Sequence, residues 1–506
     1  MSLFSHPGRY RRQLLCLLSL AACPSVAPAF QFHTSHSDPV APVIIGVTAI
    51  LFVALLGRFG ARKLGLPSVL GELSMGILIG NLAYVAGFDL IVVLREGPAI
   101  FDTVENLLHG EAVEQAFTLA LGTERSEHLF ALLTGPHGNE LIQVAHTLDV
   151  FSRYGIIFLL FMVGLRTSIE EMRQVGPDSV RVALIGVLLP FALGFASSYL
   201  LIPDITFHTS LFLGAALGAT SVGISVMVLQ DLKLEDTRVA HIILGAAVLD
   251  DILGLLLLAI VSGIVVTGGI ELGQILSVII MTALFLAGAI YLGPYLLKLV
   301  IHLIRHLDIL EAKMFVSFLF VMALAWMANL AGLATIIGAF TAGLIMHDAY
   351  FRYWGQVHEH RICIKDLIMP LEVILVPIFF VLMGVQVKLE TFLDWKVVIL
   401  AAGLLVSAIA GKLLAGLGAS RDSNRWAVGL GMLPRGEVGL IFAAIGRSLE
   451  VIDDALFSAV VLMVILTTLL APPLLKRSLQ RGGGGRGIPP GIDARAESGS
   501  QDECGH

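Results

Sequence analysis

Long apolar runs alternate with short polar breaks along most of the chain. Runs of this length are typical of α-helices that cross a membrane, because about 20 apolar residues span a hydrocarbon core of about 30 Å. Cutting the chain at its polar, Gly and Pro breaks predicts thirteen spans and an all-α polytopic membrane protein. The expected spans are residues 41–58, 68–86, 149–165, 180–202, 208–230, 238–262, 272–298, 312–330, 333–347, 367–387, 396–418, 425–446 and 454–475.

The composition supports this interpretation. Apolar residues make up 57% of the 506 residues, charged residues only 14%, and the mean hydropathy is +0.88. Soluble domains contain about 25% charged residues, so a soluble enzyme, a disordered scaffold and a nucleic-acid-binding protein are excluded. The 52 glycines favour closely packed and broken helices. No nucleophile–base pair and no metal cluster is recognisable, so we expect no enzyme activity and no cofactor.

The N-terminal residues have the pattern of an export signal. Three arginines, a short apolar run and the small residues of Ala27-Pro-Ala29 predict a signal peptide over residues 1–29. A short external N-terminus over residues 30–40 would follow. The alternatives are an uncleaved extra helix and a lipoprotein-like cleavage before Cys23.

Two further segments lie outside the predicted spans of the transmembrane domain, residues 41–475. Residues 87–147 carry nine acidic residues against two arginines and are expected to form an external loop. Residues 476–506 are Gly-rich and polar, which predicts a disordered cytoplasmic tail.

The distribution of Lys and Arg predicts the orientation. With the N-terminus outside, the cytoplasmic loops and tail would hold 21 of these residues. The external loops would hold only 6, namely Arg95, Arg125, Arg153, Lys388, Lys396 and Arg447. Positive residues favour the cytoplasmic side, so we expect an external N-terminus and a cytoplasmic C-terminus in the inner (plasma) membrane of a bacterium.

Asp250 and Asp251 are adjacent in the middle of a predicted span. An ionisable residue at this depth is unfavourable by at least about 2.5 kcal/mol and requires a functional or structural reason. Two neighbouring carboxylates in a medium of low dielectric repel each other and bind a proton or a small cation well. We therefore expect a cation and proton site here, with a helix cap or an interhelical hydrogen bond as the alternative.

Lys412 also lies inside a predicted span. A buried carboxylate would keep its ammonium charged, and Asp250 is the obvious partner. The alternative is that the side chain extends to the membrane interface, since Lys412 is about six residues from the end of its span.

Two segments are expected to interrupt their helices. Gly431-Met-Leu-Pro-Arg-Gly-Glu-Val-Gly439 contains Arg435 and Glu437, whose charges can satisfy freed backbone groups and helix dipoles, as a structural or a transport role. Gly214–Ser225 offers hydroxyls, among them Thr220 and Ser221, that can cap backbone groups or coordinate a cation; a small-residue packing face is the alternative. If spans 1–6 and 8–13 are inverted repeats, the two breaks occupy matching positions, as at many transporter sites.

Two glutamates are weaker candidates. Glu72 lies near the start of its predicted helix, where capping is the simplest role. Glu372 lies about one turn inside its span. Either could belong to a proton path.

Several motifs together resemble the monovalent cation:proton antiporter superfamily, in particular Kef-type and NapA-type sodium/proton exchangers. They are Gly164-Leu-Arg-Thr-Ser, Leu249-Asp-Asp-Ile, Ile336-Ile-Gly-Ala-Phe-Thr-Ala-Gly-Leu, Pro377-Ile-Phe-Phe-Val-Leu-Met-Gly and Leu433-Pro-Arg-Gly-Glu-Val-Gly-Leu. The resemblance covers roughly residues 40–475. Unlike Kef proteins, the chain has no recognisable regulatory nucleotide-binding domain.

The resemblance implies a core domain, a dimerisation domain, two crossed unwound helices and a homodimer with an elevator-type movement. It implies that Asp251 is the main carrier, with Asp250 beside it, and that Lys412 pairs with the first aspartate. Arg435 and Glu437 would match the charges of the second unwound helix. The expected activity is exchange of a monovalent cation for protons, with Na⁺ favoured over K⁺. The alternatives are a K⁺/H⁺ antiporter or K⁺ efflux pathway gated by a separate subunit, and a sensor that binds a cation without transport.

Overall fold

The protein is described here from a computed structural model. The structure describes residues 40–96, 132–133, 135–166, 176–202, 205–220, 225, 229, 237–267, 272–303, 309–346, 350, 363–435 and 437–481. The expected signal peptide, most of the acidic loop, Ser221 and the tail beyond residue 481 lie outside these ranges.

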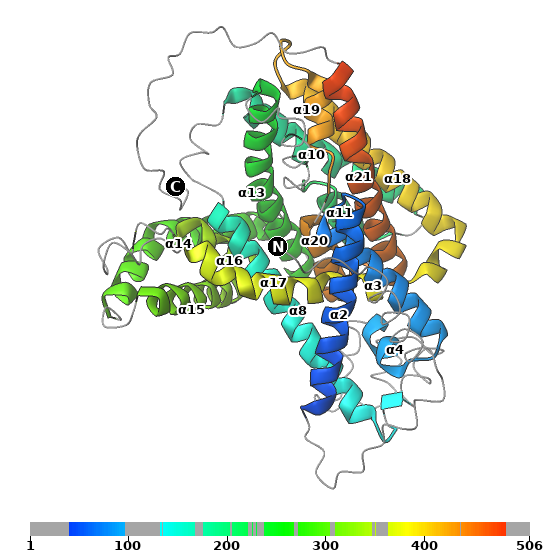
Figure 1. Cartoon of the computed structure of the whole chain (residues 1–506). Coiled ribbons are helices and arrows are strands. Elements are labelled where there is room, and N and C mark those ends of the chain that lie inside the picture. The colour runs from blue at the N-terminus through cyan, green and yellow to red at the C-terminus, as the bar shows by residue number, and fades with distance from the viewer. Residues whose placement is uncertain are drawn as a thin grey trace, which may run out of the picture.

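The described chain is a bundle of helices (Figure 1). The α-helices are α2 (Ala41–Lys63), α3 (Ser68–Val85), α4 (Asp89–Glu96), α8 (Gly138–Arg166), α10 (Pro177–Leu201), α11 (Phe207–Ala216), α13 (Arg238–Thr267), α14 (Leu272–Leu303), α15 (Ile309–Leu330), α16 (Thr335–Ile345), α17 (Ile364–Val385), α18 (Trp395–Ala415), α19 (Arg425–Gly431), α20 (Glu437–Ser448) and α21 (Asp454–Arg481). Two short 3₁₀ helices, η4 (Leu389–Leu393) and η5 (Gly416–Gly418), flank α18.

The helices pack as two groups. One, called the α8 group here, contains α2, α3, α4, α8, α14, α15, α16 and α17. The other, called the α13 group, contains α10, α11, α13, α18, α19, α20 and α21 (Figure 1). Helix α13 also packs against α14, the helix that follows it in the chain. The pair formed by Asp250 and Lys412 lies wholly within the α13 group.

Glycines allow close helix crossings within the groups. A Cβ on Gly57 of α2 would overlap the carbonyl oxygen of Gly71 on α3, and a Cβ on Gly71 would overlap that of Gly57. Helices meet this closely only through residues without side chains, because in lipid their association depends on van der Waals packing.

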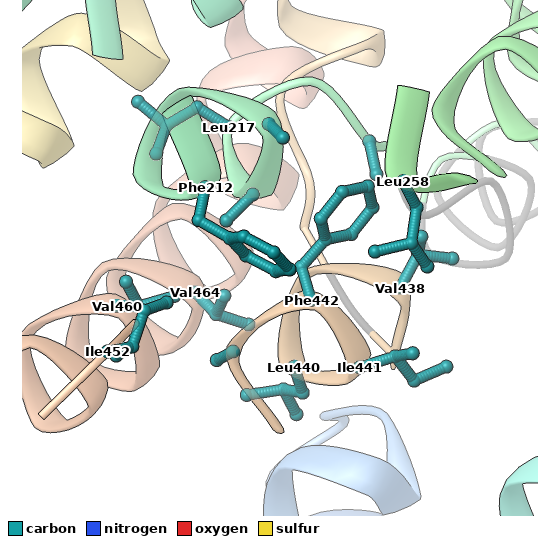
Figure 2. Packing of buried hydrophobic residues seen from close by; sticks show 14 of the residues in the cluster. Phe212, Leu217, Leu258, Val438, Leu440, Ile441, Phe442, Ile452, Val460 and Val464 are labelled. Atoms are coloured by element: carbon teal, nitrogen blue, oxygen red, sulfur yellow. The ribbon is translucent and has the colours of Figure 1, made fainter. Parts of the chain in front are cut away.

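A large apolar cluster contains residues from both groups. Phe212 of α11 and Phe442 of α20 lie next to each other at its centre, with Val464 of α21 on one side and Leu258 of α13 on the other (Figure 2). All four side chains are nearly or fully buried. This packing holds two short helices, α11 and α20, against the longer ones, although neither is long enough to span a membrane alone.

Within the described residues, ten helices are long and apolar enough to cross a membrane, compared with the thirteen predicted spans. Three of the thirteen predicted spans have no single helix of that length. In the part of the chain that the structure describes, span 208–230 contains α11, span 333–347 contains the short α16, and span 425–446 is divided into α19 and α20.

Two predicted segment boundaries differ from the structure. Helix α8 begins at Gly138, so the last part of the expected loop 87–147 is helical. Leu141, Val144, Ala145 and Leu148 recur at helical spacing and pack against α2 and α17, a signal that the acidic composition obscured. Helix α21 continues to Arg481, beyond the expected end of the last span.

Candidate functional site

Two helices of the α13 group are interrupted in the middle of the bundle. Helix α11 ends at Ala216, and residues 217–220 leave the helical conformation. Helix α19 ends at Gly431, and α20 starts only at Glu437. Pro434 in the second break has no N–H to donate, so a continuous helix is disfavoured there. Each break frees backbone carbonyls that need donors within the protein.

The two breaks satisfy each other. The Thr220 hydroxyl donates to the Met432 carbonyl oxygen at 3.3 Å, and the Ser225 hydroxyl donates to that of Gly431. In the opposite direction, Nη1 of Arg435 donates to the Ala219 carbonyl oxygen at 2.7 Å. The expected pair of breaks is therefore present, and the two lie side by side. Here the Thr220 hydroxyl caps a freed backbone group, one of the two roles expected from the sequence.

Lys412 reaches the first break from α18. Its Nζ donates to the Gly218 carbonyl oxygen at 2.7 Å and lies 3.1 Å and 3.3 Å from Oδ1 and Oδ2 of Asp250 on α13. Both side chains are 0% exposed. The structure thus contains the pair predicted from the sequence, and Lys412 does not extend to the membrane interface.

Gly186 of α10 faces this pair. A Cβ placed on Gly186 would lie 3.6 Å from Nζ of Lys412 and 3.7 Å from Oδ1 of Asp250. The ammonium and carboxylate are therefore enclosed by α10, α13, α18 and the end of α11. Attraction between opposite charges is strong in such a medium, whereas an unpaired charge would be highly unfavourable.

Arg435 adds a second buried cation. Its side chain is 0% exposed, and among the described residues Nε and Nη2 have no hydrogen-bond partner. Lys412 and Arg435 together neutralise the consecutive carbonyls of Gly218 and Ala219, which lie at the negative end of the α11 dipole. The site thus has two fixed cations around one described carboxylate, so a further anionic group beside them would be stabilised.

The other predicted site residues are placed as follows. Asp251 follows Asp250 on α13, and Glu437 is the first residue of α20, but neither side chain is among those described. Ser221 lies outside the described residues.

The two weaker candidates belong to the α8 group. Glu72 is buried on α3 and forms an ion pair with Arg58 of α2. The capping expectation for Glu72 is wrong, because α3 starts at Ser68 and Glu72 lies one turn inside it. Glu372 is on α17 between Pro370 and Pro377.

Sequence reasoning missed a group of buried charges near the ends of the helices. Arg95, Lys388 and Arg447 were expected in external loops, yet they are only 1%, 2% and 9% exposed. Each is ion-paired with an acidic residue, Glu390, Glu96 or Asp454. Lys388 and Arg447 lie one residue beyond a predicted span end, which was a usable signal, whereas Arg95 lies nine residues beyond one.

A cavity of about 530 Å³ lies between the two helix groups. Its lining includes Asp149 of α8, Phe379 of α17 and Gln386 at the end of α17, from the α8 group. Ser262 of α13 and Arg447 of α20 line it from the α13 group. The cavity therefore lies where a movement of one group past the other would change its shape.

Comparison with known proteins agrees with this architecture. Residues 126–481 match the family described as "Sodium/hydrogen exchanger, transmembrane". The chain belongs to the sodium/hydrogen exchanger family. The chain is 34% identical to the high-affinity Na(+)/H(+) antiporter NhaS3 of Synechocystis. The matched 447 residues cover 87% of this chain and 90% of that protein. The chain is 32% identical over 418 residues to the Na(+)/H(+)-K(+) antiporter GerN of Bacillus cereus, covering 81% and 89% of the two chains.

The fold of this exchanger-family member is similar to that of a solved structure, the sodium proton antiporter MjNhaP1 from Methanocaldococcus jannaschii at pH 8. The TM-score is 0.57 at 17% identity, over 88% of this chain and 100% of the other. The exchanger family consists of membrane transporters, so the expectation that this chain is not an enzyme is confirmed.

Proposed function

We propose that this exchanger-family protein exchanges a monovalent cation, with Na⁺ preferred, for protons at a site formed by Asp250 and Asp251. The observation that carries the proposal is the fully buried Asp250–Lys412 pair beside two interrupted helices. A buried ion pair contributes little to stability compared with apolar packing, so its presence favours a functional reason. The names of the relatives, Na(+)/H(+) antiporters, point to the same chemistry.

The proposed exchange is competition between charges. A cation that binds the aspartates weakens the attraction between Asp250 and Lys412, because it supplies the positive charge that the carboxylate needs. A buried ammonium without its partner tends to lose a proton. When the cation leaves, a proton returns and the pair forms again. Thr220 and the freed carbonyls of the breaks are proposed to complete an oxygen shell, which hard cations prefer. Arg435, and with it Glu437, would balance the charge of the site.

Alternating access is proposed to result from a movement of the α13 group past the α8 group, as an elevator. The site belongs wholly to the α13 group, so it would travel with that group while the cavity between the groups changes shape. We further propose a homodimer in the inner membrane, with an external N-terminus formed after cleavage of residues 1–29 and a role in pH homeostasis.

A K⁺/H⁺ antiporter is the second candidate, favoured by the similarity to GerN, whose name includes K⁺. The site chemistry itself does not distinguish the two ions, because both are bound by oxygen atoms.

Reconstitution of the full chain in proteoliposomes tests the proposal. Internal pH is followed while Na⁺, K⁺ or Li⁺ is added. We expect a cation-dependent change of internal pH in the wild type and none in Asp251→Asn. Asp178→Asn is a matched control, because Asp178 lies at the start of α10 and is paired with Arg181 and Arg238 instead of the site. Full exchange by Asp251→Asn would reject the mechanism, and a response to K⁺ alone would select the second candidate.

A further inference from the structure

Helix α4 is anchored to α3 and η4 by a buried arginine. Nη2 of Arg95 lies 2.7 Å and 2.9 Å from the two carboxylate oxygens of Glu390 and 3.1 Å from Oδ1 of Asn81 on α3. Its guanidinium also lies over the ring of Tyr84, with Cζ 3.9 Å from the ring centroid. These contacts hold the C-terminal end of α4 in position at the start of the long acidic segment.

Arg447 of the α13 group reaches across to this anchored end. Its Nη1 donates to Oε1 of Gln386 at 3.0 Å. Its Nη2 donates to the backbone carbonyl oxygens of Arg95 at 3.0 Å and Glu96 at 3.1 Å. One guanidinium thus joins the end of α20 to α4 and to the end of α17.

Lys388 makes a second connection beside the first. Its Nζ lies 2.8 Å from Oε2 of Glu96 on α4 and 2.6 Å from Oδ2 of Asp454 on α21. Asp454 is also 2.8 Å from Nη2 of Arg447. Two cations and two carboxylates therefore form one chain of ion pairs, and its members belong to both helix groups.

These contacts lie at the rim of the cavity, which Gln386 and Arg447 line. Two other ion pairs that are at least partly buried each join helices of the same group. Arg58–Glu72 joins two helices of the α8 group, and Asp178–Arg238 joins two helices of the α13 group. Those pairs can persist when one group moves past the other. By contrast, Arg447 of α20 binds Gln386 and the backbone carbonyl oxygens of Arg95 and Glu96, which belong to the α8 group. Lys388, in the link between α17 and η4, joins Glu96 of α4 to Asp454 of α21.

We propose that Glu96, Lys388, Arg447 and Asp454 form a latch that holds the two helix groups in the arrangement with an open cavity between them. The latch opens when the α13 group moves and closes when it returns. Buried ion pairs suit this role, because breaking one leaves uncompensated charges and the equilibrium therefore favours the closed latch. The inference rests on the proposed function, since it takes the relative movement of the groups from it.

A labelling experiment tests the latch without any transport. The four cysteines of the full chain are replaced, and Ala444→Cys is introduced on the α20 wall of the cavity. The rate of its reaction with a charged methanethiosulfonate reagent in detergent reports how often the cavity is open. Glu96→Gln removes the carboxylate that Lys388 binds on α4, while Lys388 stays paired with Asp454 and the backbone carbonyls that accept from Arg447 remain. Asp178→Asn is the control, because it removes a carboxylate bound by two arginines within one group.

We expect Glu96→Gln to slow the labelling by about threefold or more, because the population with an open cavity falls, and Asp178→Asn to leave the rate unchanged. An unchanged rate in Glu96→Gln, or an equal decrease in both variants, would overturn the latch. If Glu96→Gln yields no folded protein, Asp454→Asn breaks the same bridge from α21 and carries the same expectation. If the wild type exchanges cations for protons but Glu96→Gln does not change the labelling rate, only the latch is rejected. If Glu96→Gln slows the labelling but the wild type shows no exchange, only the proposed function is rejected.

Discussion

Thr468 of α21 donates its hydroxyl hydrogen bond to the backbone carbonyl oxygen of Arg435, and so holds the second helix break in place. Thr468 is 1% exposed, and the carbonyl that its hydroxyl binds lies in the break between α19 and α20. A residue outside the breaks therefore supports their geometry.

Thr468→Val should destabilise the protein by about 1–2 kcal/mol, because the shape is kept while a buried carbonyl loses its donor. Thermal unfolding in detergent measures the effect. Thr48→Val is the matched control, since the Thr48 hydroxyl makes a hydrogen bond within its own helix and is exposed. Equal stability of the two variants would show that the break is held by other contacts.

Lys412→Ala should change the pH profile of exchange, because it removes the ammonium that lies 3.1 Å from the Asp250 carboxylate and takes part in the proposed exchange. The rate of exchange in proteoliposomes between about pH 5 and 10 measures this, as a range chosen to cover ordinary Asp and Lys titration. Lys396→Ala, at the exposed start of the same helix, should leave the profile unchanged. A profile that is the same in Lys412→Ala and wild type would count against the ion-pair mechanism.

Gly411→Ala should destabilise the protein by about 1–3 kcal/mol, because overpacking forces the helices apart. A Cβ on Gly411 of α18 would lie 2.7–2.9 Å from atoms of Pro190 on α10. Gly186→Ala, in the same helix pair, would meet its neighbours at 3.5–3.7 Å, an ordinary contact, and should be tolerated. Unfolding temperatures in detergent compare the two, and a Gly411→Ala variant as stable as Gly186→Ala would contradict the close approach of α10 and α18.

Glu72→Gln should retain exchange while losing stability, because Glu72 pairs with Arg58 within the α8 group and contacts no member of the candidate site among the described residues. Removing one partner of a largely buried pair leaves an uncompensated charge, and losses of about 1–3 kcal/mol are expected. Exchange and thermal unfolding are measured on the same preparation. Loss of exchange with unchanged stability would instead place Glu72 on a proton path.

Much of the fold could be predicted because its signals are local. Apolar runs identify the ten long helices, and Gly and Pro identify the place where α19 and α20 separate. The predicted end of the loop 87–147 was wrong, because α8 already begins at Gly138. The acidic composition of the loop hid the helical spacing of Leu141, Val144 and Leu148. Average composition and periodicity gave different answers there, and the packing of one helix face against α2 and α17 determined the result.

The apolar runs, the Gly and Pro breaks and the charges inside the spans were enough to infer repeated membrane crossing, two interrupted helices and the unusual depth of Asp250 and Lys412. The sequence also suggested that these two residues pair. The packing of the helices was needed to show that the pair, 162 residues apart in the chain, meets beside the carbonyl of Gly218. It alone decided that Arg95, Lys388 and Arg447 are buried ion-pair partners instead of loop charges. The physical reason is that hydropathy and helix breaking depend on neighbouring residues, whereas the burial and pairing of a charge depend on which distant helices pack around it.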